Sequence, residues 1–516
     1  MIPLATEVDP SESLAVRSLS ALKWNYIGTF ARAASQFVIG IVLARLLGPE
    51  PFGLVAIALL VVSLGALIGD FGLVSALVQR KSISREDIRA VFSLQVLVGA
   101  VLTVCVFLLS DSIADFFRRT DAASILKAMS VMFLLQALGQ TASALLRRNL
   151  DFRKLQLAQF GSYLVGYLLF GMPLAFAGMG VWSLVVAQLA QSVLFSLTVY
   201  ALVRHPVMPH FQRSGGSLFG FGMKVMVSNL GSWGIANLDS AVIGRNFGIL
   251  ELGLYNRAFN LVSTPMGVLV TGLQTVLFAA TARAQDNKSA LQRTYLGILG
   301  VMAFISLPIF ASVATIPDTV ILAVYGEKWV SAASLLIPLS LAISVSALLA
   351  LGGPVMSGMG RAGQEMWVQL VTLAVFALVL SGASRYPIEG VAWIVMAIYL
   401  LRFVLVTGVT LKLVGGSVVS LAGALMSPVL VAALSAMTTF FVDACLREGT
   451  YTPLVRLTAA ALAGGIAGAL LFALLLRRRL VARPTVWILD QLWERIPLAG
   501  LFFSGRRVSY GHARGS

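Results

Sequence analysis

Charge is scarce in this sequence. Only 12% of its 516 residues are Asp, Glu, Lys or Arg, against about 25% in a typical soluble domain. Apolar residues make up 58% of the chain, and the mean hydropathy is +0.90. A water-soluble fold has no interior large enough to bury so many apolar side chains. The composition therefore excludes a soluble protein and predicts an integral membrane protein.

The residues used in metal sites and in catalysis are equally few. The chain has two cysteines, Cys105 and Cys445, both in or beside apolar runs, and three histidines, His205, His210 and His512. This excludes a disulfide framework and a cysteine-based metal site. There is no phosphate-binding Gly-rich loop with Lys-Ser/Thr, no Gly-x-Ser-x-Gly motif and no pair of acids placed for acid–base chemistry. We therefore expect no enzyme activity, no cofactor and no metal.

Long apolar runs fill most of the chain. A helix needs about 20 apolar residues to cross a bilayer, and fourteen such runs are separated by Gly, Pro or clustered charge. They are much longer than the strands of a membrane barrel. The fold class predicted is all-α, with about 14 transmembrane helices. The expected spans are 21–45, 52–77, 90–110, 122–145, 156–178, 180–203, 222–245, 256–281, 294–316, 331–354, 366–384, 389–413, 419–441 and 454–476.

The loop cations predict the orientation. Lys and Arg are enriched in the cytoplasmic loops of membrane proteins. Most of them face the cytoplasm here if both termini do, including Arg80, Lys81, Arg147, Arg148 and the run 477–479. The first 20 residues lack the apolar core of a cleavable signal peptide. The net charge of +16 is therefore explained by the membrane topology and by attraction of the loop cations to anionic lipid headgroups. We expect no nucleic-acid partner.

Two parts of the chain are related by a shift of 200 residues. In both copies the repeat joins an odd-numbered span to the next, which predicts two six-helix lobes with the same orientation and an arrangement found in transporters. The matching pairs are Arg45/Arg245, Gly48/Gly248, Gly53/Gly253, Leu54/Leu254, Ala58/Ala258 and Ser63/Ser263. The expected units are 1–20 (cytoplasmic N-terminus), 21–203 (N-lobe), 222–413 (C-lobe), 419–476 (two further helices) and 477–516 (cytoplasmic tail).

Several polar side chains fall inside predicted spans. Arg32 lies near the centre of the first span and shares a helical face with Asn25 and Gln36. Arg402 is central in the twelfth span. A charge at this depth costs several kcal/mol unless it has a partner or faces water. The seventh span carries a related polar set, namely Asn229, Asn237, Asp239 and, at its outer end, Arg245.

Two interpretations of these groups remain open. In the first, Arg32, Asp239 and Arg402 form buried ion pairs, and amide side chains bridge neighbouring helices. In the second, they line a polar cavity whose arginines bind an anionic cargo. Arginine forks match phosphate oxygens well, so the second interpretation favours a phosphate-bearing cargo. Asp239 is then a candidate site for a coupling ion.

At the repeat, the sequence resembles the Wzx-type (WzxC-like) oligosaccharide flippases of the multidrug/oligosaccharidyl-lipid/polysaccharide exporter superfamily. The stretches that carry this resemblance are LARLLGPEPFGL at 43–54, GDFGLVSALVQR at 69–80 and LGLYNRA at 252–258. The resemblance implies a monomer of two lobes around a central cavity, with a fold like that of the multidrug exporters called MATE. It adds Arg45, Arg245 and Arg257 to the expected cationic lining.

The resemblance also implies a cargo and a location. The cargo is an undecaprenyl-pyrophosphate-linked oligosaccharide, passed from the cytoplasmic to the periplasmic leaflet of a bacterial inner membrane for exopolysaccharide, capsule or lipopolysaccharide synthesis. Membrane lipids, a polymerase and export machinery are the implied partners. In the tail, Val486, Trp487, Leu489, Leu492, Trp493 and Ile496 beside Arg483 and Arg495 predict an amphipathic helix on the inner membrane surface.

Three alternatives remain. A multidrug/cation antiporter of the MATE type shares the expected fold, but Arg32 stands where such exporters tend to carry an acid in the first span. A membrane glycosyltransferase or polymerase would need a large loop with catalytic acids, and the chain has none. A non-transporting scaffold of the polysaccharide machinery would not need a polar cavity.

Overall fold

The computed structural model describes residues 14–70, 77–78, 83–210, 216–285 and 287–493. Every regular element in these residues is helical, and thirteen helices are long and apolar enough to cross a membrane. Each overlaps one of the predicted spans; residues 71–76 of the second predicted span, 52–77, lie outside the described residues. The remaining prediction, 222–245, falls within the 31-residue helix α9. The all-α membrane fold is therefore confirmed.

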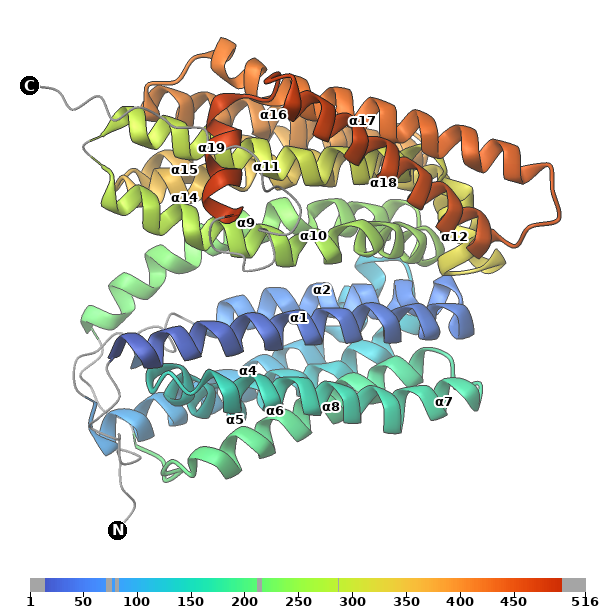
Figure 1. Ribbon diagram of the computed structural model, residues 1–516. Helices are drawn as coiled ribbons and strands as arrows, with labels where there is room; N and C mark the ends of the chain where they lie inside the picture. Colours follow the sequence, from blue (N-terminus) through green and yellow to red (C-terminus); the bar gives the residue numbers. More distant parts are fainter. Residues whose placement is uncertain (1–13, 71–76, 79–82, 211–215, 286, 494–516) are drawn as a thin grey trace, which may run out of the picture.

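The helices form two groups (Figure 1). The first group consists of α1 (Leu14–Leu47), α2 (Pro49–Asp70), α4 (Arg85–Phe116), α5 (Asp121–Arg148), α6 (Phe152–Val165), η1 (Gly166–Gly171), α7 (Met172–Phe176) and α8 (Val181–Val203). The second consists of α9 (Gly216–Asn246), α10 (Ile249–Arg283), α11 (Lys288–Thr315), α12 (Pro317–Val324), η2 (Glu327–Ala332), α13 (Ala333–Leu349), α14 (Gly352–Gly358), α15 (Ala362–Leu380), η3 (Ala383–Arg385) and α16 (Ile388–Val414). Packed on the second group are α17 (Val418–Arg447), α18 (Pro453–Arg477) and α19 (Arg483–Trp493).

Local sequence explains where several helices begin. Ser84 and Asp87 form a capping box at the start of α4, and Ser417 and Ser420 form one at the start of α17. These side chains satisfy backbone N–H groups that have no partner inside the helix. The fifth span contains a π-helical turn, η1, which leaves Gly166 against the α8 backbone.

The internal repeat has a structural counterpart where the two groups meet. Gly48 and Gly248 have φ angles of +80° and +96° and join α1 to α2 and α9 to α10. Both values lie in the left-handed region that favours glycine. We call this end of the molecule, with residues 44–53 and 244–253, the latch end. The opposite end, where α1 begins and α18 ends, is the terminus end.

At the latch end, α2 and α10 cross with almost no space between their backbones. A Cβ atom added to Gly53 would overlap the Ile249 carbonyl oxygen and lie 3.2 Å from Gly253 N. One added to Gly253 would overlap the Pro49 carbonyl oxygen and lie 3.1 Å from Gly53 N. The two sets of contacts are equivalent under the 200-residue shift, so a local pseudo-two-fold axis passes between these two glycines.

The predicted tail helix is present as α19. It runs across α11 rather than along it (Figure 1), and the Arg293 guanidinium lies 4.4 Å from the centre of the Trp487 ring. Thr485 is fully buried, close to Gly300 of α11. The helix is thus docked on protein as well as amphipathic. The predicted tail residues Arg495 and Ile496 lie outside the described residues, as does most of the stretch 69–80.

Candidate functional site

Arg32 lies on the face of α1 that packs on α6. Its Nη1 donates a 2.7 Å hydrogen bond to Gln159 Oε1. Closer to the start of α1, the Gln156 amide donates to Asn25 Oδ1 at 2.8 Å. Arg32 is only partly buried and Gln36 is exposed. The amide therefore holds the Arg32 guanidinium in place without neutralising its charge.

Arg257 joins the two helix groups. It belongs to α10, yet its guanidinium lies 3.6 Å from the centre of the Phe52 ring on α2. A Cβ atom on Gly40 of α1 would lie 3.2 Å from Arg257 Nη1. Among the described residues, neither Arg257 nor Arg32 has a carboxylate within ion-pair distance. In this part of the chain both guanidiniums therefore carry charge that no carboxylate compensates, and Arg257 carries it at the contact between the two groups.

Arg45 and Arg245 form a crossed pair of contacts at the latch end. Arg45 Nε donates to the Val324 carbonyl at 2.8 Å, and Arg45 Nη2 donates to the Ala323 carbonyl. Arg245 Nη1 donates to the Phe116 carbonyl at 3.3 Å, and its guanidinium lies 4.1 Å from the Phe116 ring centre. Each arginine thus binds carbonyl oxygens at the C-terminal end of a helix in the other group, where the helix dipole favours a cation.

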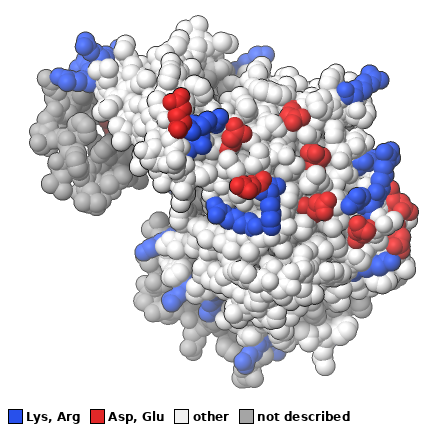
Figure 2. Space-filling view, turned by 90° about the vertical axis from the view of Figure 1, so that its right-hand side faces the viewer, with Lys and Arg blue, Asp and Glu red and all other residues white. Residues whose placement is uncertain are grey.

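Two further contacts tie the groups together beside this pair. Lys328 Nζ donates to the Leu46 carbonyl at 3.0 Å, and the buried indole of Trp329 donates to the Ala44 carbonyl at 2.9 Å. Viewed from the latch end, acidic and basic side chains are interspersed over the surface (Figure 2). We call the contacts of Arg45, Arg245, Lys328 and Trp329 the latch contacts.

The predicted polar residues of α9 lie in different environments. Asn229 is exposed, whereas the Asn237 amide donates to the Trp233 carbonyl of its own helix at 2.9 Å. The Trp233 indole donates to Ser63 Oγ of α2 at 2.9 Å and is another contact between the groups. Asp239 is 5% exposed and accepts hydrogen bonds from the Tyr255 hydroxyl and the Ser240 backbone. Among the described residues, the Asp239 carboxylate is thus hydrogen-bonded to neutral donors and is not paired with an arginine.

Arg402 lines a separate cavity of about 240 Å³ inside the second group. The cavity lies between α10, α13, α14, α15 and α16. Arg402 Nε is buried without a hydrogen-bond partner in the described part of the chain. Glu365 is the acid in the cavity wall.

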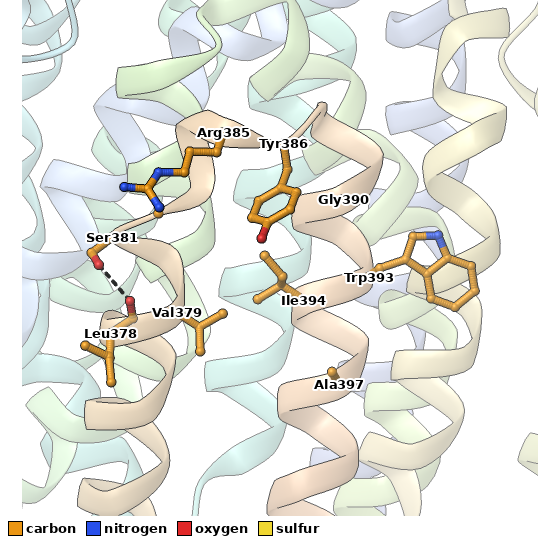
Figure 3. Close-up of a pocket in the computed structure, with 10 residues that line it drawn as sticks. Leu378, Val379, Ser381, Arg385, Tyr386, Gly390, Trp393, Ile394 and Ala397 are labelled. Atoms are coloured by element: carbon orange, nitrogen blue, oxygen red, sulfur yellow. Dashed lines mark hydrogen bonds between the residues drawn. The ribbon is translucent and has the colours of Figure 1, made fainter.

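A larger cavity, of about 650 Å³, opens between α15 and α16 at the latch end. Figure 3 shows Arg385 and Tyr386 at its rim, with Tyr386 directed toward Ile394 and Trp393 turned away. Trp393 is 47% exposed and Leu378 is 74% exposed. This cavity contains none of the predicted site residues and lies on the apolar outer face of the second group.

The predicted site residues therefore fall into five places rather than one. Arg32, Asn25 and Gln36 are on α1; Asn229, Asn237 and Asp239 are on α9; Arg257 lies between the groups; Arg45 and Arg245 are at the latch end; Arg402 is in its own cavity. Their role in substrate binding stays a prediction. Sequence reasoning did not pair Gln159 with Arg32, and it missed Glu365, which lines the cavity of Arg402, and Asp443, which binds Arg456. For Gln159 the sequence contained a signal, because an amide inside an apolar span needs a partner.

The chain was compared with known proteins. A family model described as "Polysaccharide biosynthesis protein" matches residues 42–334, which is more than half of the sequence. The chain belongs to this family. The resemblance to Wzx-type transporters of the larger exporter superfamily is confirmed by this match together with the curated relatives below.

Curated relatives from several bacteria support this assignment. The lipopolysaccharide biosynthesis protein WzxC of Escherichia coli is 29% identical over 66% of this chain and 70% of its own length. The succinoglycan biosynthesis transport protein ExoT of Rhizobium meliloti is 28% identical over 72% and 76%. The teichuronic acid biosynthesis protein TuaB of Bacillus subtilis is 26% identical over 76% and 82%.

Solved structures share the fold at low sequence identity. The lipid II flippase MurJ in an inward closed conformation superposes with a TM-score of 0.70 over 90% of this chain and 99% of its own, at 14% identity. An inward-facing multidrug resistance MATE transporter gives 0.58 over 76% and 99%, at 17% identity. This likeness confirms the predicted MATE-like fold.

Proposed function

We propose that this protein is a flippase that moves an undecaprenyl-pyrophosphate-linked oligosaccharide from the cytoplasmic to the periplasmic leaflet of a bacterial inner membrane. Its relatives are named for the synthesis or transport of lipopolysaccharide, succinoglycan and teichuronic acid. The fold it shares with MurJ is that of a protein named as a lipid II flippase. The polymer served is an exopolysaccharide, a capsule or lipopolysaccharide.

The observation that carries this proposal is the uncompensated charge of Arg32 and Arg257. Moving a pyrophosphate through hydrocarbon costs tens of kcal/mol, so a route across the bilayer must supply water and positive charge. Arg32 is partly exposed on α1, and Arg257 lies where α10 meets α1 and α2. We infer that they attract the pyrophosphate between two lobes while the lipid tail stays in the bilayer.

The mechanism proposed is alternating access. The latch contacts hold the two lobes together at one end, and the distribution of loop cations predicts this end in the periplasm and both termini in the cytoplasm. The cargo then enters from the cytoplasmic side, and breaking the latch contacts releases the headgroup outward. Asp239, solvated by Tyr255, is the candidate for binding a coupling ion, and the proposed working unit is a monomer that delivers to a polymerase and export machinery.

Deletion of the gene tests this function. Lipid-linked repeat units are expected to accumulate in the inner leaflet of the mutant, and surface polymer is expected to disappear. The wild-type gene is expected to restore both. Normal polymer in the deletion strain, together with drug resistance on overexpression, would instead identify a multidrug antiporter.

Complementation with variants tests the role of Arg32. A hydrogen bond to a charged group contributes about 1.5–3 kcal/mol, so Arg32→Ala is expected to lower polymer export about tenfold or more at unchanged protein abundance. Lys23 is exposed on the same helix, and Lys23→Gln is the matched control, expected to export normally. Full export by Arg32→Ala would refute the role of this side chain.

A further inference from the structure

The cavity around Arg402 has a mixed polar lining that ion pairing does not explain. Arg402 and Glu365 both face it, together with Gln274, Ser346 and Tyr399. Electrostatic attraction acts between Arg402 and Glu365, but no ion pair within 4 Å joins them in the described chain. A donor group and an acceptor group therefore stand on different walls with space between them.

Neighbouring residues hold several of these polar groups in place. The Gln274 amide donates to the Ala350 carbonyl at 2.8 Å, and Ser357 Oγ donates to Glu365 Oε2 at 3.3 Å. A Cβ atom on Gly353 would meet the other oxygen of Glu365, so the backbone lies directly under the carboxylate. Arg402 Nε, in contrast, is buried with no partner among the described residues. A buried donor without a partner is destabilising, and a hydrogen-bond acceptor on a ligand would remove this cost.

Charge and volume restrict the ligand. One guanidinium and one carboxylate give the lining no net charge, and Glu365 repels phosphate. A ligand rich in hydroxyl groups suits both side chains, because a hydroxyl group can accept a hydrogen bond from Arg402 and donate one to Glu365. Pockets that bind drug-sized ligands measure about 300–1,000 Å³, whereas this cavity measures about 240 Å³. It therefore has room for one small ring rather than for a chain of several.

We propose that this cavity binds one neutral sugar ring of the lipid-linked cargo. The proposal rests on the flippase function above and assigns the two chemical parts of the cargo to different places: the pyrophosphate to Arg32 and Arg257, and a sugar to Arg402 and Glu365. One wall of the cavity is Gln274 of α10, and a Cβ atom on Gly272 of the same helix would lie 3.8 Å from Tyr26 of α1, so this wall lies near the first group. Arg402 is midway along α16, at a depth that the headgroup crosses.

Saturation-transfer NMR on the purified full-length protein tests the site, because it detects weak binding of small ligands. The probes are the methyl glycosides of glucose, galactose and N-acetylglucosamine. At least one is expected to bind to the wild type, and Glu365→Gln and Arg402→Gln are each expected to weaken that binding at least tenfold. Inorganic pyrophosphate is expected not to displace the glycoside.

Matched controls lie at the latch end, where Arg385 belongs to η3 and Glu389 to the first turn of α16. Glu389→Gln and Arg385→Gln remove the same charges far from the cavity and are expected to bind glycosides as the wild type does. Ser346→Leu fills the cavity while keeping both charges, and it is expected to abolish binding even if a charge variant fails to fold. Loss of binding in Arg385→Gln would move the sugar to the larger cavity of Figure 3 and overturn the proposal.

The remaining outcomes are equally decisive. Absence of glycoside binding by the wild type, equal binding by the cavity variants, or displacement by pyrophosphate each overturns the sugar site. Polymer export separates this failure from failure of the function. If the wild-type gene restores polymer while the cavity variants bind glycosides normally, the flippase function stands without this site; if the wild-type gene does not restore polymer, the function itself is wrong.

Discussion

Asp443 and Arg447 lie four residues apart on α17 and show how burial determines the contribution of an ion pair to stability. Asp443 accepts hydrogen bonds from Thr319 Oγ1 at 2.8 Å and from Arg456 Nη2 at 3.0 Å, and these three side chains join α17, α18 and α12. The side chains of Asp443 and Arg456 are 4% and 12% exposed. Arg447 is 54% exposed and contacts Asp443 and Asp318 at 3.6 Å.

These exposures predict very different effects of substitution. Removing one partner of a buried ion pair leaves the other uncompensated and costs about 3–5 kcal/mol, so Asp443→Asn is expected to lower the thermal unfolding midpoint of the purified protein strongly. An exposed pair contributes about 0–1 kcal/mol, so Arg447→Gln is the matched control. Equal midpoints for the two variants would contradict a structural role for the buried pair.

The close contact at Gly53 leads to a second prediction for a single residue. Because a Cβ atom there would overlap the Ile249 carbonyl oxygen, Gly53→Ala must push α2 away from α10, at a cost of about 1–3 kcal/mol. The unfolding midpoint and polymer export are both expected to fall. Gly267 of α10 has nothing within 4 Å of its ideal Cβ position, so Gly267→Ala is expected to be neutral or slightly stabilising. A neutral Gly53→Ala would show that the crossing is looser than described.

Which single residues matter could be predicted only in part. An arginine inside an apolar span is visible in the sequence, and Arg32 was found in this way. Its partner Gln159 was not paired with it, because the two are 127 positions apart and only the packing of α1 on α6 brings them together. The partners of Arg45 and Arg245 are backbone carbonyls, which have no sequence signature at all.

Among the elements, the helix ends at the latch end are the most informative. Arg45 at the end of α1 binds carbonyls at the end of α12, and Arg245 at the end of α9 binds the last carbonyl of α4. Each contact combines a charged donor with a helix C-terminus. The 200-residue repeat thus places one such contact on each side of the α2–α10 crossing.

Substituting these arginines is expected to favour opening of the latch end. Ala44 is fully buried there, so a cysteine at position 44, in a variant with Cys105 and Cys445 replaced by serine, reports opening to an impermeant maleimide added outside the cell. A charged hydrogen bond of about 1.5 kcal/mol corresponds to about a tenfold change in population. Arg45→Gln and Arg245→Gln are each expected to raise the labelling rate by about this factor.

The control for this experiment is a charge at the same end that does not join the two groups. In the described part of the chain Lys127 pairs with Asp111 at 2.9 Å, and both belong to the first group. Lys127→Gln is expected to leave the labelling rate unchanged. If it raises labelling as much as Arg45→Gln does, the effect is one of general surface charge and not of the latch contacts.

The elements themselves were largely predictable. Thirteen of the predicted spans match membrane-length helices because long apolar runs are a strong and local signal. The short elements α12 and η2 were not predicted. They turn the chain at Trp329, whose buried position depends on contacts with the other group rather than on its neighbours in the sequence.

At the scale of the whole molecule, transport by rocking lobes requires that the latch end separate. Lys328 Nζ lies 3.0 Å from the Leu46 carbonyl, so cysteines at positions 46 and 328 can be joined by a short, reducible bis-maleimide. The cross-link is expected to stop polymer export, and reduction is expected to restore it. Each single-cysteine variant is the control and is expected to export normally after the same treatment. Undiminished export with the link in place would rule out this movement.

The contact between Gly53 and Gly253 has one further consequence. Both residues lie near the first turn of long helices, and α2 alone has 22 residues, or about 33 Å at 1.5 Å per residue. A pivot so close to one face acts as the fulcrum of a long lever. While the latch contacts stay closed, a tilt of about 20° around it would displace the helix tips at the terminus end by roughly 10 Å, about the width of a helix, and the fulcrum itself barely moves.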